Sequence, residues 1–106
     1  MGYVYLIKDY LNGTYKIGAT RGNIEKRIKK LQTGNSTELK VEYLFETEYP
    51  FRLESMLHER YKPFNIINEW YDFTVEQVTE FKDLCSLYEK NILLLKSNPF
   101  FGKNLK

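Results

Sequence analysis

The dipeptide Asn12-Gly13, which lies between two tyrosine-bearing segments, is the feature that most restricts how this chain can fold. A type I′ turn needs a positive φ at both central residues, and Asn-Gly is a pair that readily supplies them. The flanking segments alternate as β-strands do, and both tyrosines of the first segment fall on one face. We therefore expect an antiparallel hairpin of residues 3–8 and 14–19 that holds several phenols on a small rigid platform.

A basic helix is expected directly after this hairpin. Asn23 is a favourable N-cap and Gly34 a favourable stop, so the helix should lie between them. Its apolar stripe is formed by Ile24, Ile28 and Leu31. Arg27 falls inside this stripe and away from the outer, lysine-rich face, so we predict that its guanidinium lies toward the sheet.

Two more elements are predicted in the middle of the chain. Residues 38–47 alternate apolar and polar side chains, apart from Leu44, and therefore predict a third strand. Pro50 suits the first turn of a helix. That helix should end near Tyr61, because Pro63 cannot continue it.

The C-terminal third begins with a short aromatic segment, residues 69–73, which we expect to be extended and to close over the core. Thr74 and Gln77 have the spacing of a capping box. They predict the start of a long helix over residues 74–95, and the polar composition after it predicts a flexible tail over residues 96–106.

At 106 residues the chain has room for one compact domain. The predicted order β-β-α-β-α, followed by a long helix, corresponds to an α+β fold around a small, three-stranded, mainly antiparallel sheet. We expect a core of residues 1–73, with the helix 74–95 packed on that core or on a second copy of the chain.

The formal charge of +2 is weak evidence for nucleic-acid binding, but basic residues are concentrated beside the hairpin. They are Arg21, Lys26, Lys29 and Lys30. Such a run is often only a solvated face, whereas here we expect it to bind a phosphate backbone. Cys85 is the only cysteine, which excludes an internal disulfide, and its apolar helical setting indicates a packed thiol. We see no leader or membrane-spanning run, which predicts a soluble intracellular protein.

Several residues supply the groups that phosphodiester cleavage requires: a positioned nucleophile, a proton acceptor and cations for the developing charge. Tyr5, assisted by Tyr15 or Lys16, would orient and deprotonate a water. Arg27 would bind the non-bridging oxygens, and Glu54 would hold one Mg²⁺. The same tyrosines also suit ordinary strand positions, and the lysine suits a solvated one.

The order of these residues resembles the GIY-YIG nuclease superfamily, whose name records two tripeptides about ten residues apart on the first hairpin. The shared elements, spread over residues 2–73, are Gly2-Tyr3-Val4-Tyr5, Tyr15-Lys16-Ile17-Gly18, Leu31-Gln32-Thr33, Glu54 with His58, and Glu69-Trp70-Tyr71.

The resemblance implies cleavage with one divalent ion, Mg²⁺ or Mn²⁺, and implies that Tyr5 acts as the base or positions the nucleophile. Lys16 aligns with the first tyrosine of the second tripeptide. Tyr15 is therefore offset by one residue and should face the opposite side of its strand. Arg27 matches the arginine of the superfamily, and Glu54 matches its metal-binding glutamate.

The chain departs from the superfamily pattern at Leu31, where many members have a histidine one turn after the arginine. His58 is one turn after Glu54 and would compensate, although the two residues also have the spacing of a surface pair. Glu69 is an alternative metal ligand, but its place beside Trp70 favours a role in fixing the aromatic segment.

The leading hypothesis is a Mg²⁺- or Mn²⁺-dependent endonuclease that acts on DNA. The alternative is a module on the same fold that binds nucleic acid with little or no turnover, and a weaker third possibility is a protein-interaction domain that uses the last helix. We expect a monomer or a weak homodimer.

Overall fold

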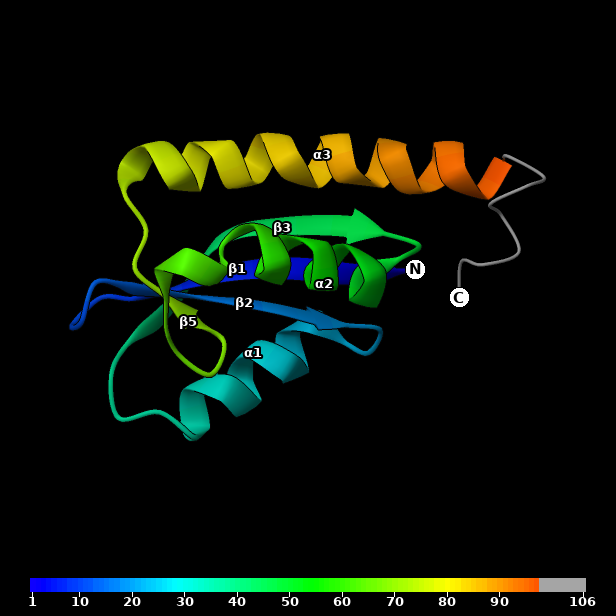
Figure 1. Cartoon of the computed structure of the whole chain (residues 1–106). Coiled ribbons are helices and arrows are strands. Elements are labelled where there is room, and N and C mark those ends of the chain that lie inside the picture. Colours follow the sequence, from blue (N-terminus) through cyan, green and yellow to red (C-terminus); the bar gives the residue numbers. More distant parts are fainter. Residues whose placement is uncertain (98–106) are drawn as a thin grey trace.

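The structure is a computed structural model that describes residues 1–97. Within this range, five strands, three α-helices and one short 3₁₀ helix follow one another (Figure 1). In order they are β1 (Gly2–Asp9), β2 (Thr14–Thr20), α1 (Ile24–Thr33), β3 (Leu39–Thr47), α2 (Pro50–Arg60), η1 (Lys62–Phe64), β4 (Asn65–Ile67), β5 (Trp70–Tyr71) and α3 (Val75–Ser97).

The sheet has five strands in the order β3-β1-β2-β5-β4, and all neighbouring strands are antiparallel. The α+β class agrees with the sequence, but the prediction of a three-stranded sheet is wrong. The two additional strands come from residues 65–67 and 70–71. Because they are so short, they show no alternation that sequence periodicity could detect.

Helices cover both faces of the sheet (Figure 1). Helix α1 lies on one face, and α2 and α3 lie on the other. The larger hydrophobic core is on the α2 and α3 side and includes Val4, Leu6 and Phe81. A smaller cluster under α1 contains Tyr5 and Ile7. The alternation predicted for the first strand is therefore confirmed, with both of its faces buried.

The predicted hairpin forms, but its type I′ turn does not. Residues 10–13 connect the two strands, and the positive φ in this loop, 69°, belongs to Gly13. Asp9 explains the difference, because its Oδ1 accepts from the backbone N–H of Leu11 (3.0 Å) and of Asn12 (3.2 Å). The Asp9 side chain therefore starts the turn ahead of the Asn12-Gly13 pair.

Strand β3 carries a β-bulge that the sequence alternation did not predict. The pairing with β1 shifts between Leu6, which lies opposite Tyr43, and Ile7, which lies opposite Val41. The extra residue moves the two ends of the strand onto different faces. Leu44, the exception in the predicted pattern, pairs with Tyr5.

The helix boundaries largely follow the predicted signals. Asn23 caps α1, and its side chain accepts from the N–H of Lys26 at 3.0 Å. At α3, the capping box forms in both directions, with Thr74 N to Gln77 Oε1 at 2.8 Å and Gln77 N to Thr74 Oγ1 at 3.1 Å.

Helix α3 continues to Ser97, so the first two residues of the predicted tail, 96–106, are helical, and residues 98–106 lie outside the described part. Several of its apolar side chains are buried in the core, as a helix packed on the same chain requires. Cys85 is one of them, which confirms the packed thiol, and burial raises its pKa to about 12. Among residues 1–97, no helix has the length and apolar character needed to cross a bilayer.

Candidate active site

Tyr5 and Arg27 meet on the face of the sheet that α1 covers. The ring of Tyr5 lies across Gly18, its partner on β2, and a Cβ at position 18 would overlap that ring. The Tyr5 hydroxyl accepts a hydrogen bond from Arg27 Nε at 3.2 Å. The prediction that Arg27 lies toward the sheet is therefore confirmed, and Gly18 is required because the ring occupies the place of a side chain.

Tyr5 is completely buried, with 0% of its surface exposed. A phenol that acts as a base must reach a water. Here its oxygen is enclosed and already accepts from Arg27. In this conformation the tyrosine therefore orients the arginine and does not present a free oxygen to a substrate.

The Arg27 guanidinium is held by one edge and faces acidic groups. The hydrogen bond and the charge interaction with Tyr5 are the main causes that raise its pKa, and Glu69 and Glu54 raise it further. Because the bond to Tyr5 uses Nε, the fork of its terminal nitrogens is left for a bidentate contact with an anion.

Lys16 lies on the same face of β2 as Gly18 and is 14% exposed. Its Nζ is 2.8 Å from Oε2 of Glu69 and 5.6 Å from the centre of the Trp70 ring. Tyr15 points to the opposite face, as predicted, and stacks on Phe73 in the larger core with ring centres 5.7 Å apart. The structure therefore places the lysine beside Arg27 and keeps Tyr15 away from both.

Three potential metal ligands come together beside Lys16 and Arg27. Glu54 and His58 are on α2, and Glu69 immediately precedes β5. One ligand atom from each residue lies within 4.8 Å of the others. His58 Nε2 is 3.5 Å from Glu54 Oε2, and His58 Nδ1 is hydrogen-bonded to the hydroxyl of Tyr71.

The cluster of Glu54, His58 and Glu69 fits a divalent cation. Two carboxylates and one imidazole are suitable ligands for Mn²⁺, and carboxylates with water suit Mg²⁺. Tyr71 holds the ring of His58 in the way that outer groups commonly orient a ligating histidine. All three side chains are partly buried, so the ligands are preorganised but remain accessible.

Glu69, the alternative metal ligand for which the sequence favoured a role in fixing the aromatic segment, lies in the cluster with Glu54 and His58. Its backbone carbonyl accepts from Ile17 N at 3.2 Å, which fixes it against β2, while its carboxylate reaches Lys16. The Glu-Trp pair was a visible signal, but only the pairing of β5 with β2 brings it to the helix that carries Glu54.

The predicted basic residues do not form one continuous row. Lys30 lines a hollow of about 250 Å³ together with Lys16 and Arg27. Lys26 and Lys29 are exposed on the outer face of α1. Arg21 is directed elsewhere: it donates to the carbonyl of Glu48 at 2.9 Å and lies 5.9 Å from the ring centre of Phe51.

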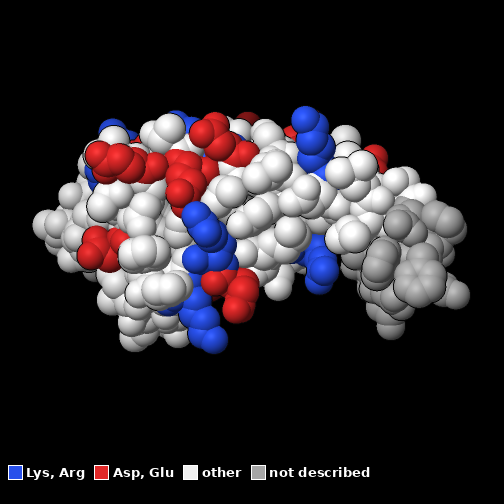
Figure 2. Space-filling model, turned by 45° about the horizontal axis from the view of Figure 1, so that its top comes forward, with Lys and Arg blue, Asp and Glu red and all other residues white. Residues whose placement is uncertain are grey.

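The face that carries α3 has a different charge pattern. In Figure 2 acidic side chains gather toward the end of the molecule where α3 begins, with basic side chains interspersed. This view shows no continuous basic surface. The lysines on α1 and around the hollow of Lys16 and Arg27 are therefore the candidates for contact with a phosphate backbone.

Comparison with known proteins gives one family. The family model of the T5orf172 domain matches residues 2–86. Neither a curated protein nor a solved structure matches the chain. The matched range includes the hairpin, α1, α2, β5 and the first half of α3.

Proposed function

The chain belongs to the T5orf172 domain family, and from this premise we propose that it is a metal-dependent endonuclease that hydrolyses phosphodiester bonds of DNA. The observation that carries the proposal is the juxtaposition of Arg27, held by Tyr5, with the ligand cluster of Glu54, His58 and Glu69. The motif order that resembles the GIY-YIG superfamily supports the same chemistry.

In this proposal one Mg²⁺ or Mn²⁺ is held by Glu54, His58 and Glu69. Such an ion, when bound, supplies positive charge for the phosphate and lowers the pKa of water. Arg27 binds two oxygens of the scissile phosphate with its terminal nitrogens, and Lys16 provides a second positive charge for the same group. Tyr5 is a positioning residue that fixes the guanidinium.

Lys16 and Glu69 are in direct contact in the structure. Their 2.8 Å ion pair keeps the Glu69 carboxylate beside the other two ligands while neutralising part of their mutual repulsion. The lysine therefore has a role in holding the ligand cluster open for a cation as well as in binding the phosphate.

Two observations favour the second candidate, a nucleic-acid-binding module without turnover. Tyr5 offers no accessible oxygen to a water, and Leu31 occupies the position one turn after Arg27 where a polar group would reach the hollow. The module would keep the basic side of α1 and lose the chemical step.

Incubation of the purified protein with supercoiled plasmid and Mg²⁺ or Mn²⁺ tests the two candidates. Glu54→Gln and Arg27→Ala should each reduce metal-dependent nicking by at least 100-fold, on the order expected for removal of one transition-state contact. Glu59→Gln is the matched control, because it neutralises an exposed carboxylate on the same helix without touching the cluster. Nicking that survives Glu54→Gln would reject the role of Glu54 in the ligand cluster, and DNA binding without cleavage in either metal would reject the enzyme.

A second measurement separates phosphate binding from chemistry. Lys29→Ala should weaken DNA binding and reduce the slope of log affinity against log salt by about 0.9, because one counterion fewer is released. The single-turnover rate at saturating protein should remain nearly unchanged, since Lys29 is exposed and outside the hollow. A large loss of that rate would contradict the assignment of Lys29 to contact with the DNA phosphate backbone.

A further inference from the structure

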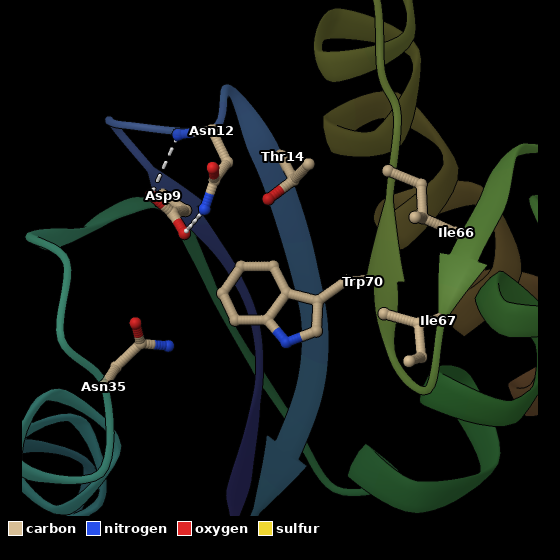
Figure 3. Close-up of a pocket in the computed structure, with 7 residues that line it drawn as sticks. All are labelled: Asp9, Asn12, Thr14, Asn35, Ile66, Ile67 and Trp70. Carbon is tan, nitrogen blue, oxygen red and sulfur yellow. Dashed lines mark hydrogen bonds between the residues drawn. The ribbon is translucent and has the colours of Figure 1, made fainter.

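A second hollow, of about 350 Å³, adjoins the candidate active site. Figure 3 shows its lining, which brings together the β1–β2 loop, the segment after α1 and the β4–β5 hairpin. Its lining includes Asp9, Asn12, Asn35, Ile66, Ile67 and Trp70. Its volume is at the lower end of the range for small-molecule sites, so it suits a compact ligand.

This hollow is continuous with the phosphate-binding side of the candidate site. Trp70 and Asn35 line both this hollow and the one that contains Lys16, Arg27 and Lys30. A phosphate held by the three basic residues therefore has the indole next to it. In a nucleic-acid strand, the group that adjoins a phosphate through its sugar is a nucleobase.

The chemistry of the lining suits a flat, aromatic and polar-edged ligand. The indole of Trp70 lies among the other lining residues in Figure 3, and stacking of bases on aromatic rings is a common mode of single-strand binding. Ile66 and Ile67, 54% and 61% exposed, add apolar surface on the β4 side.

Polar atoms at the rim are held in fixed positions. Asn35 Oδ1 accepts from the backbone N and the hydroxyl of Thr37, which turns the amide nitrogen toward the indole (Figure 3). Asn12 donates to Asp9 Oδ2 at 2.9 Å, which fixes its amide at the opposite rim. Fixed amides can pair with the nitrogen and carbonyl groups on the edge of a base.

We propose that this hollow binds one unpaired nucleobase of the strand whose phosphate lies at Lys16 and Arg27, with the base stacked on Trp70. The inference rests on the proposed function and adds the substrate class: DNA with an unpaired nucleotide at the bound position. A paired base would first have to leave its stack, at a cost that a mismatch, a flap or a single strand avoids.

Trp70 is the only tryptophan in the chain, so its fluorescence reports directly on this hollow. The probes are a single-stranded oligodeoxynucleotide, the same strand with abasic sites throughout, and a fully paired hairpin duplex, each titrated in EDTA to prevent cleavage. The intact strand should quench the fluorescence and bind about 5- to 150-fold more tightly than the abasic strand, the range given by loss of one stacked base. The paired duplex should quench little.

Variants separate stacking from charge and from folding, with binding followed by the anisotropy of a labelled strand. Trp70→Ala should remove the preference for the intact over the abasic strand, and Trp70→Phe should restore most of it. Lys29→Ala should weaken binding of both strands equally. If Trp70→Ala fails to fold, the Trp70→Phe variant and the strand comparison still decide the matter.

The outcomes distinguish this inference from the proposed function. Quenching with a clear preference for the intact strand supports the base site even if no metal gives cleavage, in which case only the enzyme is rejected. Metal-dependent cleavage with equal affinity for intact and abasic strands overturns the base site alone. Absence of binding to all three probes overturns both.

Discussion

Gly18→Ala is the substitution whose effect follows most directly from the packing. A Cβ at position 18 would overlap Cζ, Cε1 and the hydroxyl oxygen of Tyr5. The tyrosine cannot swing into solvent, because it is 0% exposed and is enclosed between the sheet and α1. Overpacking of a well-filled core costs about 1–3 kcal/mol. In a domain of about this size, each kcal/mol lowers Tm by about 4–8 °C.

Urea and thermal denaturation followed by circular dichroism would measure this loss. Gly34→Ala is the matched control, since a Cβ there meets only backbone carbonyls of Leu31 and Lys30 at 3.8 Å, an ordinary contact. The control should stay within about 0.5 kcal/mol of wild type, as surface substitutions usually do.

A double-mutant cycle assigns the loss to the Tyr5 ring. In a Tyr5→Leu background the added methyl group enters space that the ring has vacated, so Gly18→Ala should cost much less there, with a coupling energy above about 0.5 kcal/mol. Equal costs in both backgrounds, or a single variant as stable as the control, would refute the overlap argument.

Three other predictions concern residues outside the candidate site. Asp9→Asn should destabilise the protein more at pH 7 than at pH 3. Burial opposes ionisation of Asp9, but hydrogen bonds from Asn12 and the loop lower its pKa below 3.8, so the ionised carboxylate stabilises the fold above that pH and this stabilisation is lost as the pH falls. Equal shifts of the urea midpoint at both pH values would contradict this. Cys85, with a pKa raised to about 12 by burial, should not react with a thiol reagent at pH 8 until the protein unfolds, and rapid native-state labelling would show that the thiol is accessible. Tyr61→Phe removes a 2.8 Å hydrogen bond to Glu80 and should cost about 1 kcal/mol in denaturation experiments, so an unchanged midpoint would count against the bond.

Local signals were enough to predict the elements that have their own caps or long alternation. Asn23 and Gly34 define α1 through side-chain and backbone contacts within one turn, and Thr74 with Gln77 defines the start of α3. The position of Arg27 within an apolar stripe likewise predicted that its side chain lies toward the sheet, because helix geometry fixes which residues share a face.

The remaining features depend on contacts between distant residues. Strand β5 exists because Tyr71 and Trp70 pair with β2, and two residues have no periodicity of their own. The carboxylate of Asp9 overrode the turn preference of Asn12-Gly13. The pairing of β5 with β2 also brings Glu69 to Glu54 and His58, so the sequence could offer Glu69 as an alternative ligand but could not place it in the cluster.

Three consecutive residues have three different tasks: Glu69 just before strand β5, and Trp70 and Tyr71 within it. Glu69 reaches the ligand cluster, Trp70 forms the wall between two hollows, and Tyr71 holds the imidazole of His58. Because successive side chains point to opposite sides, a slip of one residue would interchange all of them at once. This part of the chain should therefore tolerate conservative replacements far better than an insertion or deletion, and transient fraying of so short a strand would separate the members of the ligand cluster long before the core unfolds.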